Sequence, residues 1–384
     1  MEFTKTAAVV AAVILLSLAV AHGQAGAETP ETTAPLRQSF DIHVPFAPAV
    51  LHLENGRSLT YELQLMNFSA QPLTLAGLEV LDAQTGTVLL SLYGDLLNGV
   101  LARPGLPAGA DPLRVGQGAT ALAYLAVPLG EGAPPREVRH RIIYAADDDR
   151  LHQSTTGGVA TVDRRPMLSL SPPLRGGPWA AVYDPALERG HRRVVYAVAG
   201  RAVIPGRFAI DWMHAPARAD VRASHDDGTG LGEDVLAVAD GVVVGLSDGV
   251  PEPSANSLRP RVSLAEATGN HVILDLGDGR YAFYEHLMPG LKVRVGDNVR
   301  RGQVIGGVGS TGSASRPHLH FHIADSLSPL GAEGLPYVLS GFQLVGAYES
   351  IGAFDQGEPW RRREKNRQVI GATFPGANVV VMFP

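Results

Sequence analysis

Three histidines stand within five residues near the C-terminal end of the chain, in the run His318-Leu319-His320-Phe321-His322. Successive side chains of a β-strand point to opposite faces, so a strand over this run presents all three imidazoles on one face. Neutral imidazole is a standard zinc ligand. The run therefore predicts a metal centre on one face of a strand, with Leu319 and Phe321 in the opposite layer.

Two further residues are candidates for the same centre. Asp211 ends an apolar stretch, where a charged carboxylate is unfavourable unless it is paired or binds a metal. His286 stands at the end of an expected strand, directly before a Pro-Gly turn. Two imidazoles and one carboxylate around zinc leave a fourth position open for water, as hydrolytic centres require. Spare histidines can then move protons or stabilise an oxyanion.

Short strands are the elements expected to position these residues. Glycine (44) and proline (28) are abundant and aromatic residues make up 6% of the chain, which favours strands and turns over long helices. Alternating patterns separated by turn residues recur from about 39 to 165 and are typical of a β-sandwich. In the second half, no segment has a long helical period. Strands are expected there near 235–244, 269–276, 281–287 and 318–323.

The N-terminus has the pattern of an export signal. Lys5 precedes an apolar run over 7–20, and the small residues at 25–27 fit a cleavage site. The run is shorter than the roughly 20 residues that a membrane span needs, so no stable span is expected after cleavage. We therefore expect an exported protein, periplasmic or extracellular. The chain contains no cysteine, so its stability rests on hydrophobic cores rather than on disulfides.

The 384 residues are enough for two domains. A Pro/Gly-rich passage after Ser171 predicts a linker, the charged run over 360–367 is expected to be solvated, and residues 378–384 to add an edge strand. The net charge of −6 argues against broad nucleic-acid binding. The expected segments are a signal peptide (1–27), a flexible leader (28–38), a β-sandwich-like domain for docking, positioning or autoinhibition (39–168), a linker (169–180), a second β domain (181–344) and a C-terminal extension (345–384).

Residues 190–340 resemble the lysostaphin-type zinc peptidases, a family that cuts peptide bridges in bacterial cell wall. Each matching segment is weak alone. The Gly-Asp-x-Val-x-x-Gly-Gln turn at 296–303 also occurs in lipoyl and biotinyl carrier domains, but the only nearby lysine, Lys292, lacks the hairpin setting of a carrier. The matching segments follow the family's order, at 209–211, 235–243, 269–275, 284–287, 295–306 and 307–321.

The resemblance implies a fold, an activity and a set of roles. The fold is an antiparallel β peptidase domain, the duplicated hybrid motif, whose groove holds Zn2+. The activity is that of a zinc metalloendopeptidase that hydrolyses peptidoglycan cross-bridges or stem peptides. Asp211 and His320 match the family's metal ligands, and His286 and His318 match the histidines that act on the water and the oxyanion.

Some residues are expected to support the site rather than to bind metal. His322 stands where many relatives have Glu. Asn270 could bond in the groove or serve a turn, and Tyr284 could line the cleft or pack in the core. Glu285 is expected to be a solvated or turn carboxylate rather than a catalytic one.

One departure from the family concerns the first metal ligand. The usual ligand is a histidine four residues before the aspartate, where this chain has Arg207, and a protonated guanidinium cannot bind zinc. His191 is the first candidate to replace it, because its segment could pair beside the Asp211 strand, and His214 and His225 are further candidates. Two alternatives stay open: a weakened two-ligand site, and a degenerate domain that binds cell wall or a partner protein without cutting. An ion pair between Arg207 and Asp211 would favour the degenerate domain.

Overall fold

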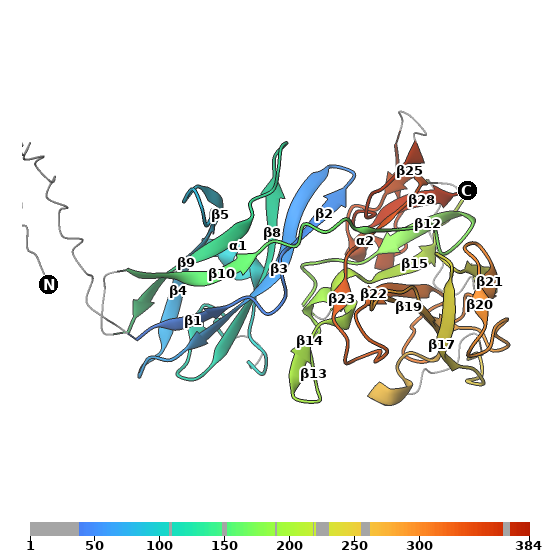
Figure 1. The fold of residues 1–384 in the computed structure, drawn as a ribbon, viewed down its shortest axis with the longest axis horizontal. Coiled ribbons are helices and arrows are strands. Elements are labelled where there is room, and N and C mark those ends of the chain that lie inside the picture. The colour runs from blue at the N-terminus through green and yellow to red at the C-terminus, as the bar shows by residue number, and fades with distance from the viewer. Residues whose placement is uncertain are drawn as a thin grey trace, which may run out of the picture. The chain divides into compact units, whose positions relative to one another are not determined.

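The computed structural model describes residues 38–384 except 107–109, 148–151, 189, 218, 220–229, 255–261 and 364–368. The expected signal peptide (1–27) and nearly all of the leader (28–38) lie outside the described residues. Strands are the main regular element of the described part, with short helices such as α1 (Gly94–Val100) and α2 (Ile351–Asp355) between them (Figure 1). The predicted mainly β fold class is confirmed. Among the described residues, no helix is both long and apolar enough to span a membrane.

Residues 40–161 form two antiparallel sheets around one apolar core. The first sheet has the order β1-β3-β8-β6, with β2 paired to β3, and the second has the order β10-β9-β4-β5, with β7 paired to β4. Both sheets contribute to the core because hydrophobic and polar residues alternate along their strands. The strands are β1 (Phe40–His43), β2 (Ala49–Leu53), β3 (Gly56–Asn67), β4 (Leu73–Asp82), β5 (Val88–Tyr93), β6 (Leu101–Ala102), β7 (Arg114–Val115), β8 (Thr120–Leu129), β9 (Glu137–Ala146) and β10 (Gln153–Thr161).

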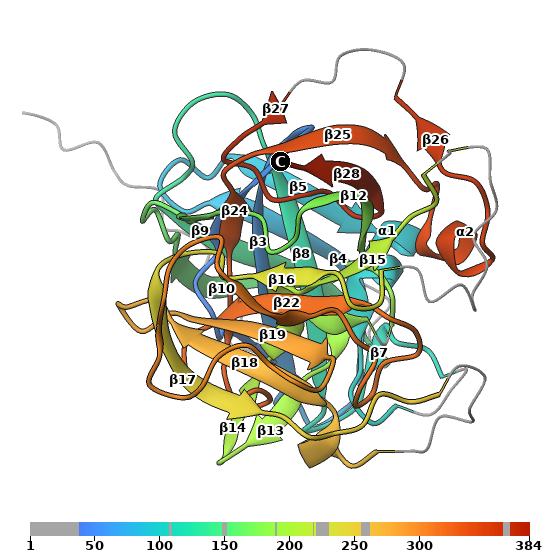
Figure 2. The same cartoon turned by 90° about the vertical axis from the view of Figure 1, so that its right-hand side faces the viewer.

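The rest of the chain is organised around one large sheet. Its order is β20-β17-β18-β19-β22-β15-β12-β28-β25-β26, and Figure 2 shows β17, β18, β19 and β22 side by side. The central strands β19 and β22 are buried along almost their whole length, because side chains pack on both of their faces. The strands are β12 (Gly176–Val182), β15 (Ile210–His214), β17 (Gly241–Ser247), β18 (Asn270–Asp275), β19 (Tyr281–Leu287), β20 (Asn298–Val299), β22 (Leu319–Ala324), β25 (Phe342–Ala347), β26 (Arg361–Arg362) and β28 (Val379–Phe383).

Smaller elements complete this part of the chain. β23 (Gly334–Leu335) pairs with β22 and β27 (Val369–Ile370) pairs with β25. Three short helices of the 3-10 type, η1 (His191–Arg193), η2 (Pro205–Phe208) and η3 (Leu264–Glu266), lie between strands. The remaining two-stranded pairs are β11 (Leu168–Leu170) with β24 (Tyr337–Leu339), β13 (Tyr196–Val198) with β14 (Arg201–Val203), and β16 (Asp234–Leu236) with β21 (Val304–Gly307).

The structure differs from the expected linker at 169–180 and from the expected edge strand at the C-terminus. β12 starts within the linker range and lies between β15 and β28, with Trp179 1% exposed. Gly176 and Gly177 both have positive φ, so these glycines provide the backbone conformation with which β12 begins, and they do not form a flexible linker. β28 pairs with β12 on one side and β25 on the other, so it is an interior strand. Its apolar run is what a strand buried on both faces requires.

Candidate metal centre

Asp211 and His320 lie directly opposite each other in the large sheet. β15 and β22 are antiparallel neighbours, and their register pairs Asp211 with His320. His320 Nδ1 lies 2.8 Å from Asp211 Oδ1. His318 Nε2 lies 3.5 Å from the same oxygen. The alternation of side chains along this part of the chain therefore brings two histidines to one carboxylate.

His191 approaches the other oxygen of Asp211 from outside the sheet. It is the first residue of η1, and its Nε2 lies 3.1 Å from Asp211 Oδ2. The possible ligand atoms of His191, Asp211 and His320 all lie within 4.8 Å of one another. The expectation that the His191 segment pairs with the Asp211 strand is wrong, because β12 and β22 occupy the two edges of β15. A short helix, not a strand, delivers this histidine.

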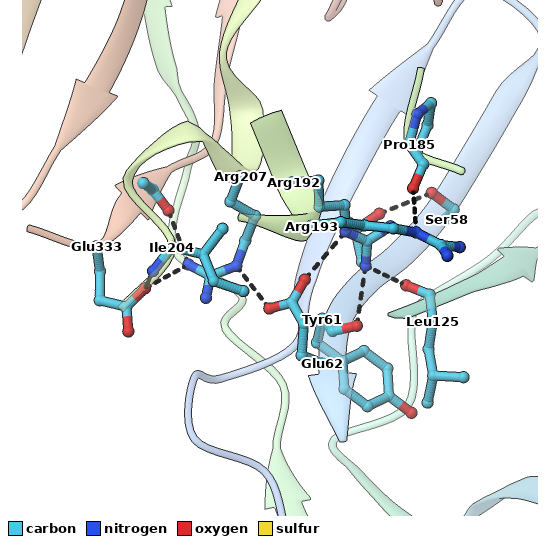
Figure 3. A network of polar contacts seen from close by, with 12 residues as sticks. Ser58, Tyr61, Glu62, Leu125, Pro185, Arg192, Arg193, Ile204, Arg207 and Glu333 are labelled. Carbon is cyan, nitrogen blue, oxygen red and sulfur yellow. Dashed lines mark hydrogen bonds and ion pairs between the residues drawn. The ribbon is translucent and has the colours of Figure 1, made fainter. Parts of the chain in front are cut away.

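The side chain of Arg207 lies between Glu62 and Glu333 (Figure 3). Its Nε donates to Glu62 Oε2 at 2.7 Å, and its Nη1 lies 2.8 Å from Glu333 Oε2. Nη1 also donates to the carbonyl of Gly334 at 3.2 Å, and the guanidinium lies 4.4 Å from the centre of the Phe46 ring. Arg207, in the family's usual ligand position, therefore forms ion pairs with two buried carboxylates. It does not form the ion pair that a degenerate site would have shown.

A β-bulge brings His286 to the centre. The register of β18 and β19 shifts here, so that Glu285 and His286 together face the single residue His271. His286 has a φ of 65°, in the left-handed region that residues other than glycine seldom adopt. The rings of His286 and His318 are 4.7 Å apart. Strained backbone of this kind occurs at functional sites because the surrounding fold holds the side chain in one direction.

Backbone carbonyls set the tautomers of His286 and His318. His286 Nδ1 lies 2.9 Å from the carbonyl oxygen of Thr311, and His318 Nδ1 lies 2.9 Å from that of Arg316. A carbonyl oxygen only accepts, so both Nδ1 atoms carry hydrogen and each Nε2 is left to take or give a proton. Gly269 permits this arrangement, because a Cβ there would lie 2.4 Å from Thr311 Oγ1.

A second cluster adjoins the first through His320. Its Nε2 lies 3.1 Å from His322 Nδ1, and the His322 ring stacks on Phe283 with 4.6 Å between centroids. The possible ligand atoms of Glu285, His320 and His322 also lie within 4.8 Å of one another. The expectation that Glu285 is solvated is wrong: it is buried, and burial raises its pKa to about 8. The bulge is the reason, because it turns Glu285 and His286 toward the histidine row together.

The carboxylate of Asp211 dominates the electrostatics of the site. Burial opposes ionisation of Asp211, but the facing His191, His318 and His320 outweigh it and hold the pKa of this carboxyl well below its usual value. Burial would likewise lower the pKa of His191, but Asp211 outweighs that effect and raises it. Burial lowers the pKa of His320 and of His286. Without metal the protein therefore holds Asp211 as a carboxylate, and His191 must give up the proton that Asp211 favours before it can bind a divalent cation.

Two residues expected to support the site bond elsewhere. Asn270 donates to the carbonyls of Val250 (2.8 Å) and Leu287 (3.1 Å), so it holds backbone beside His286 rather than facing a groove. Tyr284 is buried in the core, where its hydroxyl accepts from the Val238 N–H at 2.9 Å.

The runner-up ligand His214 does not join the cluster either. His214 packs edge-on against Trp179, with 5.1 Å between ring centroids, and lies three residues along β15 from Asp211. His225 lies outside the described residues.

The donor set fits zinc. Catalytic zinc centres take three protein ligands from imidazole nitrogens and carboxylate oxygens, and keep one position open. His191, Asp211 and His320 offer two nitrogens and a carboxylate, and all three are partly exposed, so solvent can reach the site. His322 contacts the remaining nitrogen of His320, as an outer partner of a ligand histidine commonly does.

A cluster of two imidazoles and a carboxylate beside two further histidines is the kind of donor set that metallohydrolase centres use. Residues 222–330 match the model of peptidase family M23. The match includes His286, His318 and His320. It does not include His191 or Asp211, so the upstream part of the candidate centre comes from residues that precede the matched region.

Individual relatives match over limited lengths. A segment of 54 residues is 48% identical to the glycyl-glycine endopeptidase ALE-1 of Staphylococcus capitis, and it spans 14% of this chain and 15% of that protein. Among solved structures, the catalytic domain of lysostaphin from Staphylococcus simulans is 23% identical, with 42% of this chain and 88% of that chain covered and a TM-score of 0.24. A zinc-containing peptidase from Vibrio cholerae is 14% identical, with 78% and 86% covered and a TM-score of 0.26. TM-scores this low carry no argument, so the resemblance to peptidase family M23 rests on the match over 222–330.

Proposed function

We propose that this protein is an exported zinc metalloendopeptidase that hydrolyses peptide bonds in peptidoglycan cross-bridges or stem peptides. One observation carries the proposal: His191, Asp211 and His320 bring three zinc-type donors together, with His286 and His318 adjacent. Export rests on the signal-like pattern at 1–27. The choice of substrate rests on the family and on relatives whose names describe a glycyl-glycine endopeptidase and lysostaphin.

His191, Asp211 and His320 would hold the metal. Bound zinc polarises a scissile carbonyl and brings the pKa of the attacking water toward about 7. Asp211 keeps its negative charge at neutral pH, because its pKa is held well below the usual value, so it can neutralise part of the charge of a cation there.

His286 and His318 would handle the protons and the oxyanion. Each has its Nδ1 hydrogen tied to a backbone carbonyl, so each Nε2 is free to exchange a proton with the attacking water or to donate to the developing oxyanion. His318 Nε2 lies 3.5 Å from Asp211 Oδ1, beside the proposed metal ligands. The strained backbone at His286 keeps its ring 4.7 Å from that of His318.

The non-catalytic alternative draws no support from Arg207. An arginine that neutralised Asp211 would have removed the need for a cation. Arg207 instead pairs with Glu62 and Glu333, and a histidine stands beside Asp211 in its place.

Metal analysis combined with a cleavage assay tests the proposal. We expect about one zinc per purified wild-type chain, and loss of that zinc in both His191→Ala and His320→Ala. His43→Ala is the matched control, because His43 is an exposed residue of β1. This variant should keep its zinc. The release of new amino groups from purified peptidoglycan should follow zinc content. The proposal is refuted if the wild-type protein binds no zinc and releases no peptide fragments from purified peptidoglycan.

A further inference from the structure

A buried charge network joins the sandwich to the two short helices beside the candidate metal centre (Figure 3). Glu62, in β3, accepts from Arg192 Nε at 3.0 Å through one oxygen and from Arg207 Nε at 2.7 Å through the other. The side chains of Glu62 and Arg207 are each 1% exposed, and that of Arg192 is 7% exposed. One carboxylate therefore holds η1, through Arg192, and η2, through Arg207.

The far end of each guanidinium is tied as well. Arg192 Nη2 donates to the carbonyls of Tyr61 at 2.9 Å and Leu125 at 2.8 Å, so it bridges β3 and β8 of the sandwich. Arg207 reaches Glu333 on its other side. Because a guanidinium is planar and its donors are rigidly placed, partners on several sides define its position closely. The network thus fixes geometry as well as charge.

The position of His191 depends on contacts from outside η1, because this helix is a single short turn. η1 has three residues and no side-chain cap, and Arg192 follows His191 directly in the chain. η2 packs against the same histidine: a Cβ at Gly206 would lie 3.0 Å from His191 Cβ. The backbone position of His191 is therefore set by two helices, and Glu62 ties an arginine of each.

We propose that Glu62 is a positioning residue of the metal centre, so that the sandwich is a working part of the site. Glu62 holds η1 and η2 in the register that places His191 Nε2 against Asp211. Arg207 has a role in the same arrangement. It stands where the family usually has a metal ligand, and through its ion pair with Glu62 it helps to hold His191, the residue proposed to replace that ligand. This inference rests on the proposed function, since it assumes that His191 binds the metal.

Glu62→Gln is the test, because it removes the charge and keeps the volume. We expect affinity for Zn2+, measured by competition with a chelator, to fall about 10- to 100-fold, as for other residues that orient metal ligands. The visible spectrum of the protein loaded with Co2+ reports the ligand set, and it should shift toward that of His191→Ala. Folding is checked by circular dichroism for each variant.

Two matched variants separate positioning from general stability. Glu79→Gln removes a carboxylate of the sandwich that pairs with Arg141 at 2.7 Å, and it should leave both metal readouts unchanged. Glu333→Gln removes the other partner of Arg207 but leaves the link from Glu62 to Arg192, so it should weaken metal binding less than Glu62→Gln. If Glu62→Gln does not fold, Arg192→Gln breaks the same link from the opposite side and is read in the same way.

The outcomes separate this inference from the proposed function. Glu62→Gln or Arg192→Gln that is folded and has wild-type affinity and spectrum overturns the positioning role, whatever the activity. Equal losses in Glu62→Gln and Glu79→Gln overturn it too, because they indicate general destabilisation. Wild-type protein without metal binding, or His191→Ala with a wild-type spectrum, overturns the proposed metal centre instead.

Discussion

Arg207→Met removes one cation from between two buried carboxylates while roughly keeping the volume of the side chain. Glu62 is 1% exposed and Glu333 2% exposed, so neither can recover its interaction from water. Breaking a buried ion pair by removing one partner costs about 3–5 kcal/mol, because a charge is left uncompensated. Glu62 keeps Arg192 and Glu333 keeps a longer contact to Arg201 at 3.7 Å, so we expect a loss within that range and not twice as large.

The loss should depend on pH in a defined direction. Burial opposes ionisation of Glu62, but Arg207 and Arg192 outweigh it and hold its pKa below the usual value of 4.5. A carboxyl whose pKa is lower in the folded state contributes stability above its unfolded pKa and loses it as the pH falls through the folded pKa. Without Arg207 the pKa of Glu62 rises and the group can take up a proton. The variant should therefore lose most stability near pH 7 and less near pH 4.

Urea unfolding at pH 7 and pH 4, followed by circular dichroism, measures both effects. Arg361→Met is the matched control, since Arg361 and its partner Glu349 form an ion pair at the surface with side chains 78% and 67% exposed. Exposed pairs contribute about 0–1 kcal/mol, so this variant should stay close to wild type. A free energy of unfolding for Arg207→Met within about 1 kcal/mol of wild type at pH 7 would refute the assigned network.

The other predictions concern catalysis and the sandwich core. His286→Ala and His318→Ala should keep zinc but hydrolyse peptidoglycan about 10²–10⁴-fold more slowly, the range for general acid–base groups; zinc loss in either would move that residue to the ligand set. His140 is buried between the Tyr61 hydroxyl and the Gly158 carbonyl, and burial lowers its pKa from 6.5 to about 4. Because the unfolded chain takes up this proton first, stability should fall by about 3 kcal/mol between pH 7 and pH 4, at about 1.4 kcal/mol per pKa unit. In His140→Gln the free energy of unfolding should change less between pH 7 and pH 4. An equal change in the variant and the wild-type protein would contradict the argument.

The histidine row shows how far a local pattern reaches. A two-residue period depends only on the backbone of a strand, so it predicts that Leu319 and Phe321 face away from His318 and His320. Both apolar residues are fully buried in the core, on the side opposite to Asp211. The mainly β class follows from the same kind of pattern, repeated along the chain.

The same period misleads where a second layer covers a strand. In β3, Leu63 and Leu65 alternate with polar residues, which indicates a solvated outer face for Glu62. The short helices η1 and η2 cover that face with Arg192 and Arg207, so Glu62 is buried. Nothing in the spacing of residues 62, 192 and 207 signals that they meet.

The strand pattern thus suffices for the fold class, because it depends on residues within single strands. The family motif supplies Asp211 with His320 as ligands, and the roles of His286 and His318, as hypotheses. The sequence leaves His191 as one of several candidate ligands, because its contact with Asp211, 20 positions away in the chain, depends on where the short helix η1 packs. The contact of Glu285 with the row depends on a bulge, and the burial of Glu62 on packing between segments more than 100 residues apart. Such contacts arise from the folding of distant segments onto one another, which no local period encodes.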